Sequence, residues 1–335
     1  MNPKFSITNK ILGSVADIAE LIGLMSSTAE LDKNLILRRK NRIQTIHGSL
    51  SIEQNTLTVE QVTAVINGKR VIAPPKDIEE VKNAFEIYEI LDTLDPYSVD
   101  DLLKAHGVMM RSLVDGAGDF RQKPVGVADS NTGKIIHFGT LPAYVPEAVY
   151  NLMDWTKNSD LHPLVKSCVF HYEFELIHPF LDGNGRCGRL WHTLILSKWN
   201  PMFAWLPVES MVYRHQQEYY DAINKCNDAC DSTLFIEFML DMIRSTLIEA
   251  TETTCSEKTQ KEQVAEQVKE QVMQKILDYC SVPRTRNEMQ EFSGVSGRKA
   301  FAAKYLKPLL ESGKLVMTVP DKPNSKNQRY VKAEE

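Results

Sequence analysis

Residues 178–189 read HPFLDGNGRCGR and bring a histidine, a carboxylate, a glycine-rich turn and two arginines together. Gly183 and Gly185 permit positive-φ conformations that turn successive backbone N–H groups toward one point. At the start of a helix, such a nest binds anions, especially phosphates. Arg186 and Arg189 are three residues apart and share one face of the following helix. Their guanidinium forks suit phosphate oxygens.

The same stretch supplies a base and a metal ligand. Asp182 offers a hard oxygen, and Mg²⁺ is commonly held by one or two carboxylates together with substrate phosphates. Histidine titrates near neutral pH, so His178 can serve as a general base. Phe180 is expected to anchor the loop in the core. The combination indicates phosphoryl or nucleotidyl transfer, and the sequence contains no GxxxxGK[ST] run that would indicate a Walker A loop.

Two helices must position these residues. Residues 163–177 are strongly apolar and predict a helix that ends at His178, because the residue before Pro179 is pushed out of the helical region. A second helix is predicted from Asn184 through Trp199. Apolar spacing predicts further helices, and Ser98 is expected to cap one of them; their ranges are 11–25, 81–91, 99–113, 146–156, 213–226 and 234–248.

The motif resembles the signature of the Fic family, HPFx[DE]GNGRxxR, at every specified position. The resemblance covers roughly residues 45–250. It implies a mainly α fold, a Fic-type helical bundle with a small β-hairpin flap. It also implies an enzyme that moves AMP from ATP to a Tyr, Ser or Thr hydroxyl of a target protein, with the chain itself as one candidate target.

The resemblance assigns a role to each motif residue. His178 would deprotonate the target hydroxyl, and Asp182 would hold Mg²⁺ against the α- and β-phosphates. Arg189 would meet the γ-phosphate. The remaining phosphate ligands would be Gly183, Asn184, Gly185 and Arg186.

Two looser matches extend the resemblance. Turn residues around 130–133 separate two short β-like runs and predict a hairpin. Its second run falls where the family has a flap that aligns the target segment; it consists of Ile135, Ile136, His137 and Phe138. Tyr219 and Asn227 match family residues that contact the nucleoside. An ordinary surface hairpin and plain helix packing remain the alternatives.

Many family members carry an inhibitory helix, [ST]xxxE[GN], whose glutamate pairs with the second arginine of the signature. Ser49 and Glu53 fit this pattern, but Gln54 stands where the pattern has Gly or Asn. Ser26 with Glu30 also fits the first five positions. The resemblance implies that Glu53 binds Arg189 and competes with the triphosphate, against the alternative of an exposed surface glutamate. Some braked members also remove AMP, and the sequence leaves that activity open.

The C-terminal part differs in character. Residues 251–264 are polar and predict a linker. Beyond it, helical runs, a Thr285–Glu288 capping box and two strands follow the order of a winged helix-turn-helix. Residues 281–335 hold 11 Lys and Arg against 6 Asp and Glu. This module could dock on DNA or on protein, so an ATP-sensing DNA-binding regulator is the rival function. Its basic residues are Arg298, Lys299, Lys304, Lys307, Lys322, Lys326 and Arg329.

Length, charge and cysteine content predict the compartment and the domain organisation of the chain. The chain has 335 residues and a formal charge of −5. No run of eighteen apolar residues occurs, so no membrane span is expected. Six scattered cysteines without a Cys-x-x-Cys pair favour a reducing compartment, the cytoplasm. A homodimer is left open. The predicted domains are an N-terminal helical region with the inhibitory helix (1–95), a Fic catalytic domain (96–250), the linker (251–264) and the winged helix-turn-helix (265–335).

Overall fold

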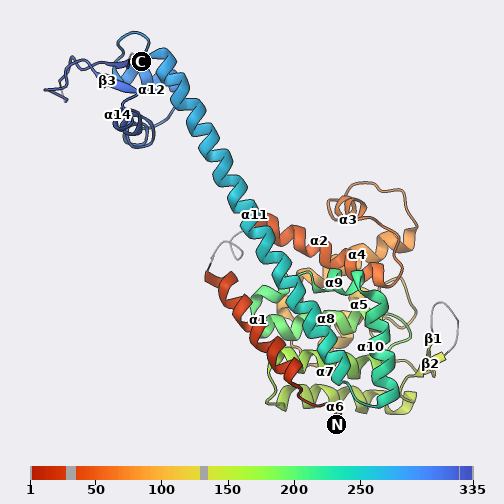
Figure 1. The fold of residues 1–335 in the computed structure, drawn as a ribbon. Helices are drawn as coiled ribbons and strands as arrows, with labels where there is room; N and C mark the ends of the chain where they lie inside the picture. Colours follow the sequence, from red (N-terminus) through yellow and green to blue (C-terminus); the bar gives the residue numbers. More distant parts are fainter. Residues whose placement is uncertain (1, 28–34, 129–134, 324, 334–335) are drawn as a thin grey trace. The chain divides into compact units, whose positions relative to one another are not determined.

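The computed structural model describes residues 2–27, 35–128, 135–323 and 325–333. The chain divides into two compact units, Met1–Thr251 and Glu252–Glu335. The fold is mainly α, as predicted, and each unit carries one two-stranded antiparallel sheet in the part of the chain that the structure describes (Figure 1).

The first unit is a helical bundle. Its α-helices are α1 (Asn9–Ser27), α2 (Leu35–Ile52), α3 (Val59–Ile66), α4 (Pro75–Glu89), α5 (Val99–Met109), α6 (Val145–Asn158), α7 (Pro163–Ile177), α8 (Asn184–Trp199), α9 (Val208–Arg214), α10 (Gln216–Ala229) and the first part of α11 (Thr233–Tyr279). Short 3-10 turns lie at Leu91–Thr93, Pro142–Tyr144 and Pro201–Ala204. A helix is present in each predicted range, and α7 and α8 have the predicted bounds. Helix α5 ends at Met109 rather than at 113, and the helix predicted at 213–226 crosses the break between α9 and α10. Ser98 caps α5 by accepting the N–H of Asp101, also as predicted.

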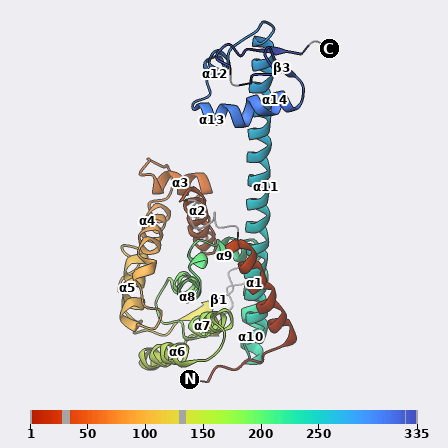
Figure 2. The ribbon, with the colours of Figure 1, turned by 90° about the vertical axis from the view of Figure 1, so that its left-hand side faces the viewer.

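Helices α7 and α8 form the centre of this unit and pack directly against each other (Figures 1 and 2). Both helices are buried over most of their length. A helix without a broad polar face is stable only when other helices surround it. The sequence of α8 therefore places it inside the bundle, with α7 beside it.

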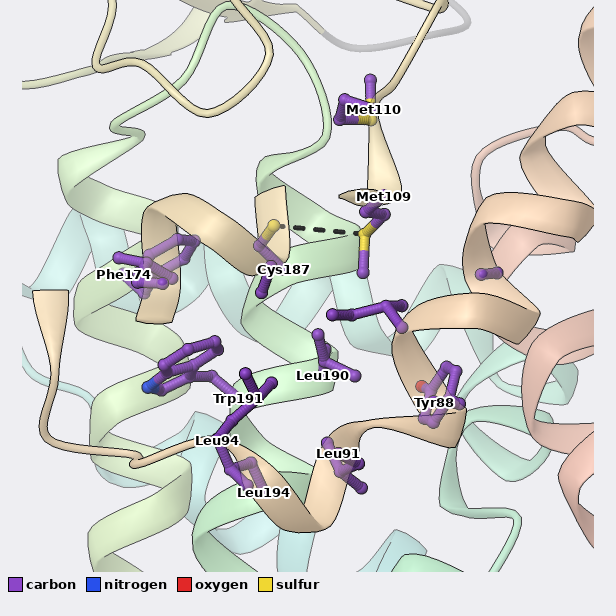
Figure 3. Packing of buried hydrophobic residues seen from close by; sticks show 14 of the residues in the cluster. Tyr88, Leu91, Leu94, Met109, Met110, Phe174, Cys187, Leu190, Trp191 and Leu194 are labelled. Carbon is purple, nitrogen blue, oxygen red and sulfur yellow. Dashed lines mark hydrogen bonds between the residues drawn. The ribbon is translucent and has the colours of Figure 1, made fainter. Parts of the chain in front are cut away.

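The core around α8 fixes where its first turn lies. Figure 3 shows Cys187, Leu190 and Leu194 on successive turns of α8, packed among buried side chains of other segments. The Cys187 thiol lies 4.0 Å from the sulfur of Met109 on α5. Truncating a buried leucine in such a core costs about 2–5 kcal/mol of unfolding free energy. The start of α8 is thus held by dense packing rather than by the loop alone.

The hairpin of the first unit consists of β1 (Gly126–Ala128) and β2 (Ile135–Phe138). The strands are antiparallel, with Val127 opposite His137 and an irregularity between Val127 and Ala128. The hairpin expected from the sequence is therefore present. The connecting turn lies outside the described residues.

Residues 251–264, predicted as a linker, are helical. Helix α11 runs from Thr233 to Tyr279 without interruption, and the boundary between the two units falls within it. Residues 251–264 lack an apolar stripe, but they also contain no Gly or Pro and are rich in Glu, Lys and Gln, which favour helix. A stretch without a core pattern can therefore still be helical.

The second unit contains the predicted succession of helices and strands. After α11 come α12 (Arg286–Ser293), α13 (Arg298–Phe301), a π-helical segment (Ala302–Leu306), α14 (Lys307–Glu311), β3 (Leu315–Met317) and β4 (Tyr330–Lys332). The capping box is formed by Thr285 and Glu288, as predicted. Arg298, Lys299, Lys304 and Lys307 are exposed. The winged helix-turn-helix assignment and the domain limits stay predictions.

Among the described residues, no helix combines the length and apolarity that a membrane crossing needs.

Candidate active site

The loop between α7 and α8 begins at His178, which ends α7 in the left-handed region with φ 51° and ψ 62°. Its N–H donates to the carbonyl of Phe174, 3.0 Å away. This conformation is unfavourable for a residue with a Cβ and costs on the order of 1–3 kcal/mol unless its surroundings fix it. The turn reverses the chain and places the imidazole at the edge of the helix pair.

Arg121 holds this turn in place. Its Nε donates to the carbonyl of His178 at 2.6 Å, and its other nitrogens donate to backbone carbonyls of Lys123, Thr140 and Ile177. The side chain is buried, and burial lowers the pKa of its guanidinium. Four carbonyls from three segments thus converge on one cation. Arg121 could not be identified from the sequence, because nothing in its neighbourhood points to the His178 loop.

Asn184 closes the other side of the loop. Its Oδ1 accepts the N–H of Phe180 at 2.8 Å, and its Nδ2 donates to the carbonyl of Phe180 at 2.9 Å. Phe180 is fully buried, as predicted. The side chain of Asn184 is therefore committed to the loop, and only its backbone remains for the phosphate contact expected from the sequence.

A second missed residue, His106, supports the loop from α5. Its Nδ1 accepts the N–H of Gly118 at 2.8 Å, so Nε2 carries the proton and donates to the carbonyl of Asp182 at 3.0 Å. The ring stacks on Phe180 with centroids 3.7 Å apart. Burial lowers the pKa of His106, which keeps it in this neutral tautomer.

The two glycines of the motif are required by conformation and space. Gly183 has φ 82°, and a Cβ there would lie 2.6 Å from the sulfur of Met110. A Cβ on Gly185 would lie 2.5 Å from Oε1 of Glu53. The positive φ expected from the sequence is therefore present at Gly183, whereas Gly185 lies within α8 without a positive φ and leaves room for the Glu53 carboxylate.

Asp182 and Arg186 form a short chain of charges. The Asp182 carboxylate is half-exposed, accepts the N–H of Gly183 at 2.6 Å and lies 3.3 Å from Nη2 of Arg186. Arg186 is buried, and its Nη1 lies 3.0 Å from Oε1 of the equally buried Glu80. Arg186 thus lies between two carboxylates. Sequence reasoning missed Glu80, since it lies 106 residues from its partner.

Arg189 lies one turn further along α8 and is also buried. Its Nη2 lies 2.8 Å from Oε1 of Glu53 and donates to the carbonyl of Ser49, while Nε donates to the Ser49 hydroxyl. Burial opposes the charged form, but the Glu53 carboxylate outweighs it and raises the pKa of Arg189. The contact between Glu53 and Arg189 expected from the sequence is present in the structure.

A tight turn after α2 places Glu53. The N–H of Gln54 donates to the carbonyl of Ser51, and Gln54 itself has φ 67°. Asn55 follows and donates from Nδ2 to Oε2 of Glu80 at 2.8 Å. The turn is therefore tied to the carboxylate that also holds Arg186. Glu30, the alternative glutamate, lies outside the described residues.

These groups line a pocket of about 150 Å³ that opens to solvent. It is smaller than the roughly 300–1,000 Å³ of typical ligand pockets, and the Glu53 side chain lies in its wall. The lining brings together the base, the second arginine and both residues predicted to contact the nucleoside; its residues are Glu53, Glu175, Leu176, His178, Gly185, Arg189, Tyr219, Tyr220, Ile223, Asn224 and Asn227.

Tyr219 and Asn227 make internal contacts at the pocket wall. The Tyr219 hydroxyl lies 3.1 Å from Nε2 of His171, and Oδ1 of Asn227 accepts the Tyr172 hydroxyl at 3.0 Å. Tyr219 is almost fully buried, and burial raises its pKa well above the usual value. Both residues are thus packed parts of the wall, as the alternative interpretation for Tyr219 expected, while lining the pocket.

The hairpin ends beside His178. A Cβ on Gly139, just after β2, would lie 3.0 Å from Cβ of His178. Phe138 is 68% exposed. The side chains of Ile135, Ile136 and His137 lie outside the described residues, and the contact with the base is made by the backbone just after the predicted flap.

Comparison with known proteins gives consistent matches. Residues 96–196 match the model of the Fic/DOC family, and residues 267–331 match that of the C-terminal domain of Fic-like proteins (filamentation induced by cAMP). The chain is 26% identical over 234 residues to protein adenylyltransferase fic-1 of Caenorhabditis elegans and 30% identical over 208 residues to protein adenylyltransferase Fic of Nematostella vectensis. These alignments cover 66% and 58% of this chain but only 43% and 45% of those proteins.

A solved structure matches over the full length. The crystal structure of a Fic family protein from Desulfovibrio desulfuricans is 42% identical, with a TM-score of 0.74, and the match covers 100% of this chain and 99% of that one. A Fic domain containing signaling protein from Bacteroides thetaiotaomicron is 21% identical with a TM-score of 0.59, covering 69% and 94%, and shares the fold. With the signature on the loop between α7 and α8 and a match at this identity over both units, the chain belongs to the Fic family.

Proposed function

We propose that this chain is a protein adenylyltransferase, which transfers AMP from ATP to a hydroxyl side chain of a protein. The single observation that carries the proposal is the pocket in which His178, Gly185 and Arg189 meet Tyr219 and Asn227. A base, an anion-binding helix start, a buried cation and an aromatic wall are the groups that such a reaction requires. The names of the curated relatives support the same activity.

The first turn of α8 is the proposed phosphate site. Gly183, Asn184 and Gly185 contribute backbone N–H groups at the positive end of the helix. Arg189 supplies the guanidinium for the γ-phosphate once Glu53 withdraws. Arg186 already lies between Glu80 and Asp182, so we propose that it acts mainly by orienting Asp182 and adding positive potential.

Asp182 would hold Mg²⁺. Its carboxylate is half-exposed, and one carboxylate together with phosphate oxygens and waters is a common donor set for this ion. The ion would neutralise phosphate charge when bound. Arg186 and the N–H of Gly183 fix the carboxylate before the nucleotide arrives.

His178 is the proposed base. A backbone carbonyl can only accept, so the contact between Nδ1 and the carbonyl of Glu175, 3.3 Å away, requires a proton on Nδ1. The lone pair is then on Nε2. The target hydroxyl gives its proton to Nε2 as its oxygen bonds to the α-phosphorus, and the bond from that phosphorus to the bridging oxygen breaks. Pyrophosphate leaves with the electron pair.

Glu53 is the proposed brake. It takes the donors on Arg189 that a γ-phosphate would need, and its carboxylate repels a triphosphate in the same pocket. The close approach of Glu53 to Gly185 narrows the space at the start of α8. Both effects oppose ATP binding in the resting chain.

The test uses ATP labelled on the α-phosphate, with Mg²⁺, and four full-length proteins: wild type, Glu53→Gly, His178→Ala and the double variant. We expect label on protein to rise in Glu53→Gly and to vanish without His178. Absence of label in all four, with ATP bound and a target protein supplied, would overturn the proposal in favour of an ATP sensor. A parallel incubation with pre-labelled protein distinguishes removal of AMP, which would need Glu53.

A further inference from the structure

We infer that Glu175 is a positioning residue for His178: its carboxylate stabilises the imidazolium that forms during transfer, while its backbone carbonyl orients the ring. The inference rests on the proposed function, because it assigns a partner to the proposed base. Glu175 precedes His178 by three residues on α7, and its side chain lines the same pocket. None of the motif positions includes it.

The geometry places Glu175 between two histidines. Its Oε2 lies 3.9 Å from Nδ1 of His178, and its Oε1 lies 3.8 Å from Nε2 of His171. The side chain is only 14% exposed. In the part of the chain that the structure describes, the buried Oε1 has no hydrogen-bond partner. At 3.9 Å the coupling to His178 is that of an ion pair rather than of a hydrogen bond.

Packing alone does not account for a carboxyl at this position. Burying a carboxyl without a full set of hydrogen bonds destabilises the folded state, and an apolar or amide side chain of similar size would avoid that cost. The charged or titratable groups that face Glu175 come from four segments; they are His171 and His178 at the end of α7, Cys187 and Arg189 on α8, Glu53 after α2, and Tyr219 and Tyr220 on α10. Burial raises the pKa of Cys187, Tyr219 and Tyr220, so these three groups stay neutral.

Only one of these groups changes charge in the proposed reaction. His171 is fully buried, and burial holds its pKa well below the usual value, so it stays neutral. Arg189 is already paired with Glu53 or, in the active state, with phosphate. His178 alone gains a proton, on Nε2, while Nδ1–H keeps donating to the backbone carbonyl of Glu175, with the Glu175 carboxylate 3.9 Å from the same nitrogen. A carboxylate at ion-pair distance from Nδ1 therefore stabilises the protonated base selectively, as a third group orients the base in a catalytic triad.

The charge of Glu175 is present only in part of the pH range. Burial, helped by Glu53 and opposed by Arg189, raises the pKa of Glu175 to about 7. The carboxyl is ionised above that pH and neutral below it. A neutral carboxyl resembles glutamine, so a charge role predicts that Glu175→Gln matters most at alkaline pH and less as the carboxyl is protonated.

The experiment measures AMP transfer from pH 5.5 to 8.5 in the Glu53→Gly background with Glu175→Gln added. Glu173→Gln is the matched control, because Glu173 lies on the same helix, has a pKa likewise raised to about 7 by burial, and does not line the pocket. The background lacks Glu53, whose charge helps raise the pKa of Glu175, so the carboxyl of Glu175 stays ionised to lower pH than in the resting chain. We expect kcat of Glu175→Gln to fall at least about tenfold at pH 8, with KM for ATP changed less than about threefold, and the difference from the parent to shrink toward the acid end of the range. Glu175→Asp should recover part of the loss, and Glu173→Gln should follow the parent.

A second readout needs no turnover. NMR titration of the His178 ring, assigned by comparison with His178→Ala, should give a lower pKa for His178 in Glu175→Gln than in the parent. The same shift in Glu173→Gln, or no shift in Glu175→Gln together with unchanged kcat, would overturn the inference. If the parent transfers no AMP, the proposed function fails, yet the titration still tests the coupling. If Glu175→Gln does not fold, a His178 titration in the parent that shows no second inflection from Glu175 would also overturn it.

Discussion

Replacing Glu53 with glutamine removes one charge from the pocket while keeping the shape of the side chain. The contact at stake is the 2.8 Å hydrogen bond from Arg189 to Oε1 of Glu53. Hydrogen bonds to charged groups contribute about 1.5–3 kcal/mol. Glu53 is 29% exposed, so solvent screens part of the interaction between Arg189 and Glu53. We therefore take the lower end of that range, about 1.5 kcal/mol, for this hydrogen bond. Since about 1.4 kcal/mol is a tenfold change, Glu53→Gln should bind ATP roughly tenfold more tightly.

The assay is calorimetric titration of ATP with Mg²⁺ into the full-length protein, in a His178→Ala background so that no transfer occurs. Glu218→Gln is the control, because Glu218 is exposed and pairs only with His215 among the ion pairs found in the described residues. The same change should destabilise the protein without ATP, because the buried Arg189 cation then loses its carboxylate partner and keeps only neutral acceptors, the oxygens of Ser49 and the glutamine amide oxygen. A loss of about 1–2 kcal/mol lowers Tm by a few degrees, and ATP should restore it.

The two effects must occur together. Tighter ATP binding with unchanged stability would mean that the pair contributes little and that Glu53 acts by occupying space. Unchanged ATP affinity in both Glu53→Gln and Glu53→Gly would refute competition for Arg189, whatever happens to stability.

Three further outcomes are expected from the same geometry. Gln54→Gly should strengthen inhibition by Glu53, because the φ of 67° at position 54 is strained for Gln and unstrained for Gly. Basal AMP transfer should fall up to about fivefold, and an increase in transfer would contradict this prediction. Asn184→Ala removes both hydrogen bonds to the backbone of Phe180. It should lower the free energy of unfolding, measured by chemical denaturation, by about 1–3 kcal/mol and should reduce AMP transfer. An unchanged denaturation midpoint would contradict the role of Asn184 in holding the loop. Arg121→Lys keeps the charge, but an ammonium group cannot donate to all four carbonyls that Arg121 contacts. We therefore expect kcat to fall while the affinity for ATP is retained. An equal loss of kcat and of ATP affinity would indicate unfolding, which circular dichroism would detect.

The sequence was informative where local chemistry decides the structure. Pro163 opens α7, and the restriction before Pro179 closes it at His178. A glycine in the left-handed region then precedes α8. Because these signals act over a few residues, the two helices were predicted with their observed bounds. The motif between them could also be matched to a family, which gave the mainly α fold. The pairing of Glu53 with Arg189 came from that resemblance and not from any local signal.

Sequence-based prediction is ambiguous where one local pattern is compatible with two structures. Polar residues without an apolar stripe can form a loop or a helix, and residues 251–264 form a helix. The arginines of the motif both suit phosphate, yet Arg186 is held by Glu80 and Asp182 while Arg189 is held by Glu53 and Ser49. Spacing along α8 could not distinguish these environments, because they depend on which distant segment packs against each turn.

The residues that support the loop between α7 and α8 could be identified only from the tertiary structure. Arg121 lies 57 residues from His178, His106 lies 76 residues from Asp182, and Glu80 lies 106 residues from Arg186. A lone arginine, histidine or glutamate in a helical sequence carries no sign of such a partner. Each became a support because the packing of the bundle buried it beside a backbone carbonyl or an opposite charge, where an unpaired polar group would be costly. The sequence by itself determined which chemical groups are present and the two helices that carry them, and the packing of the bundle decided what holds them in place.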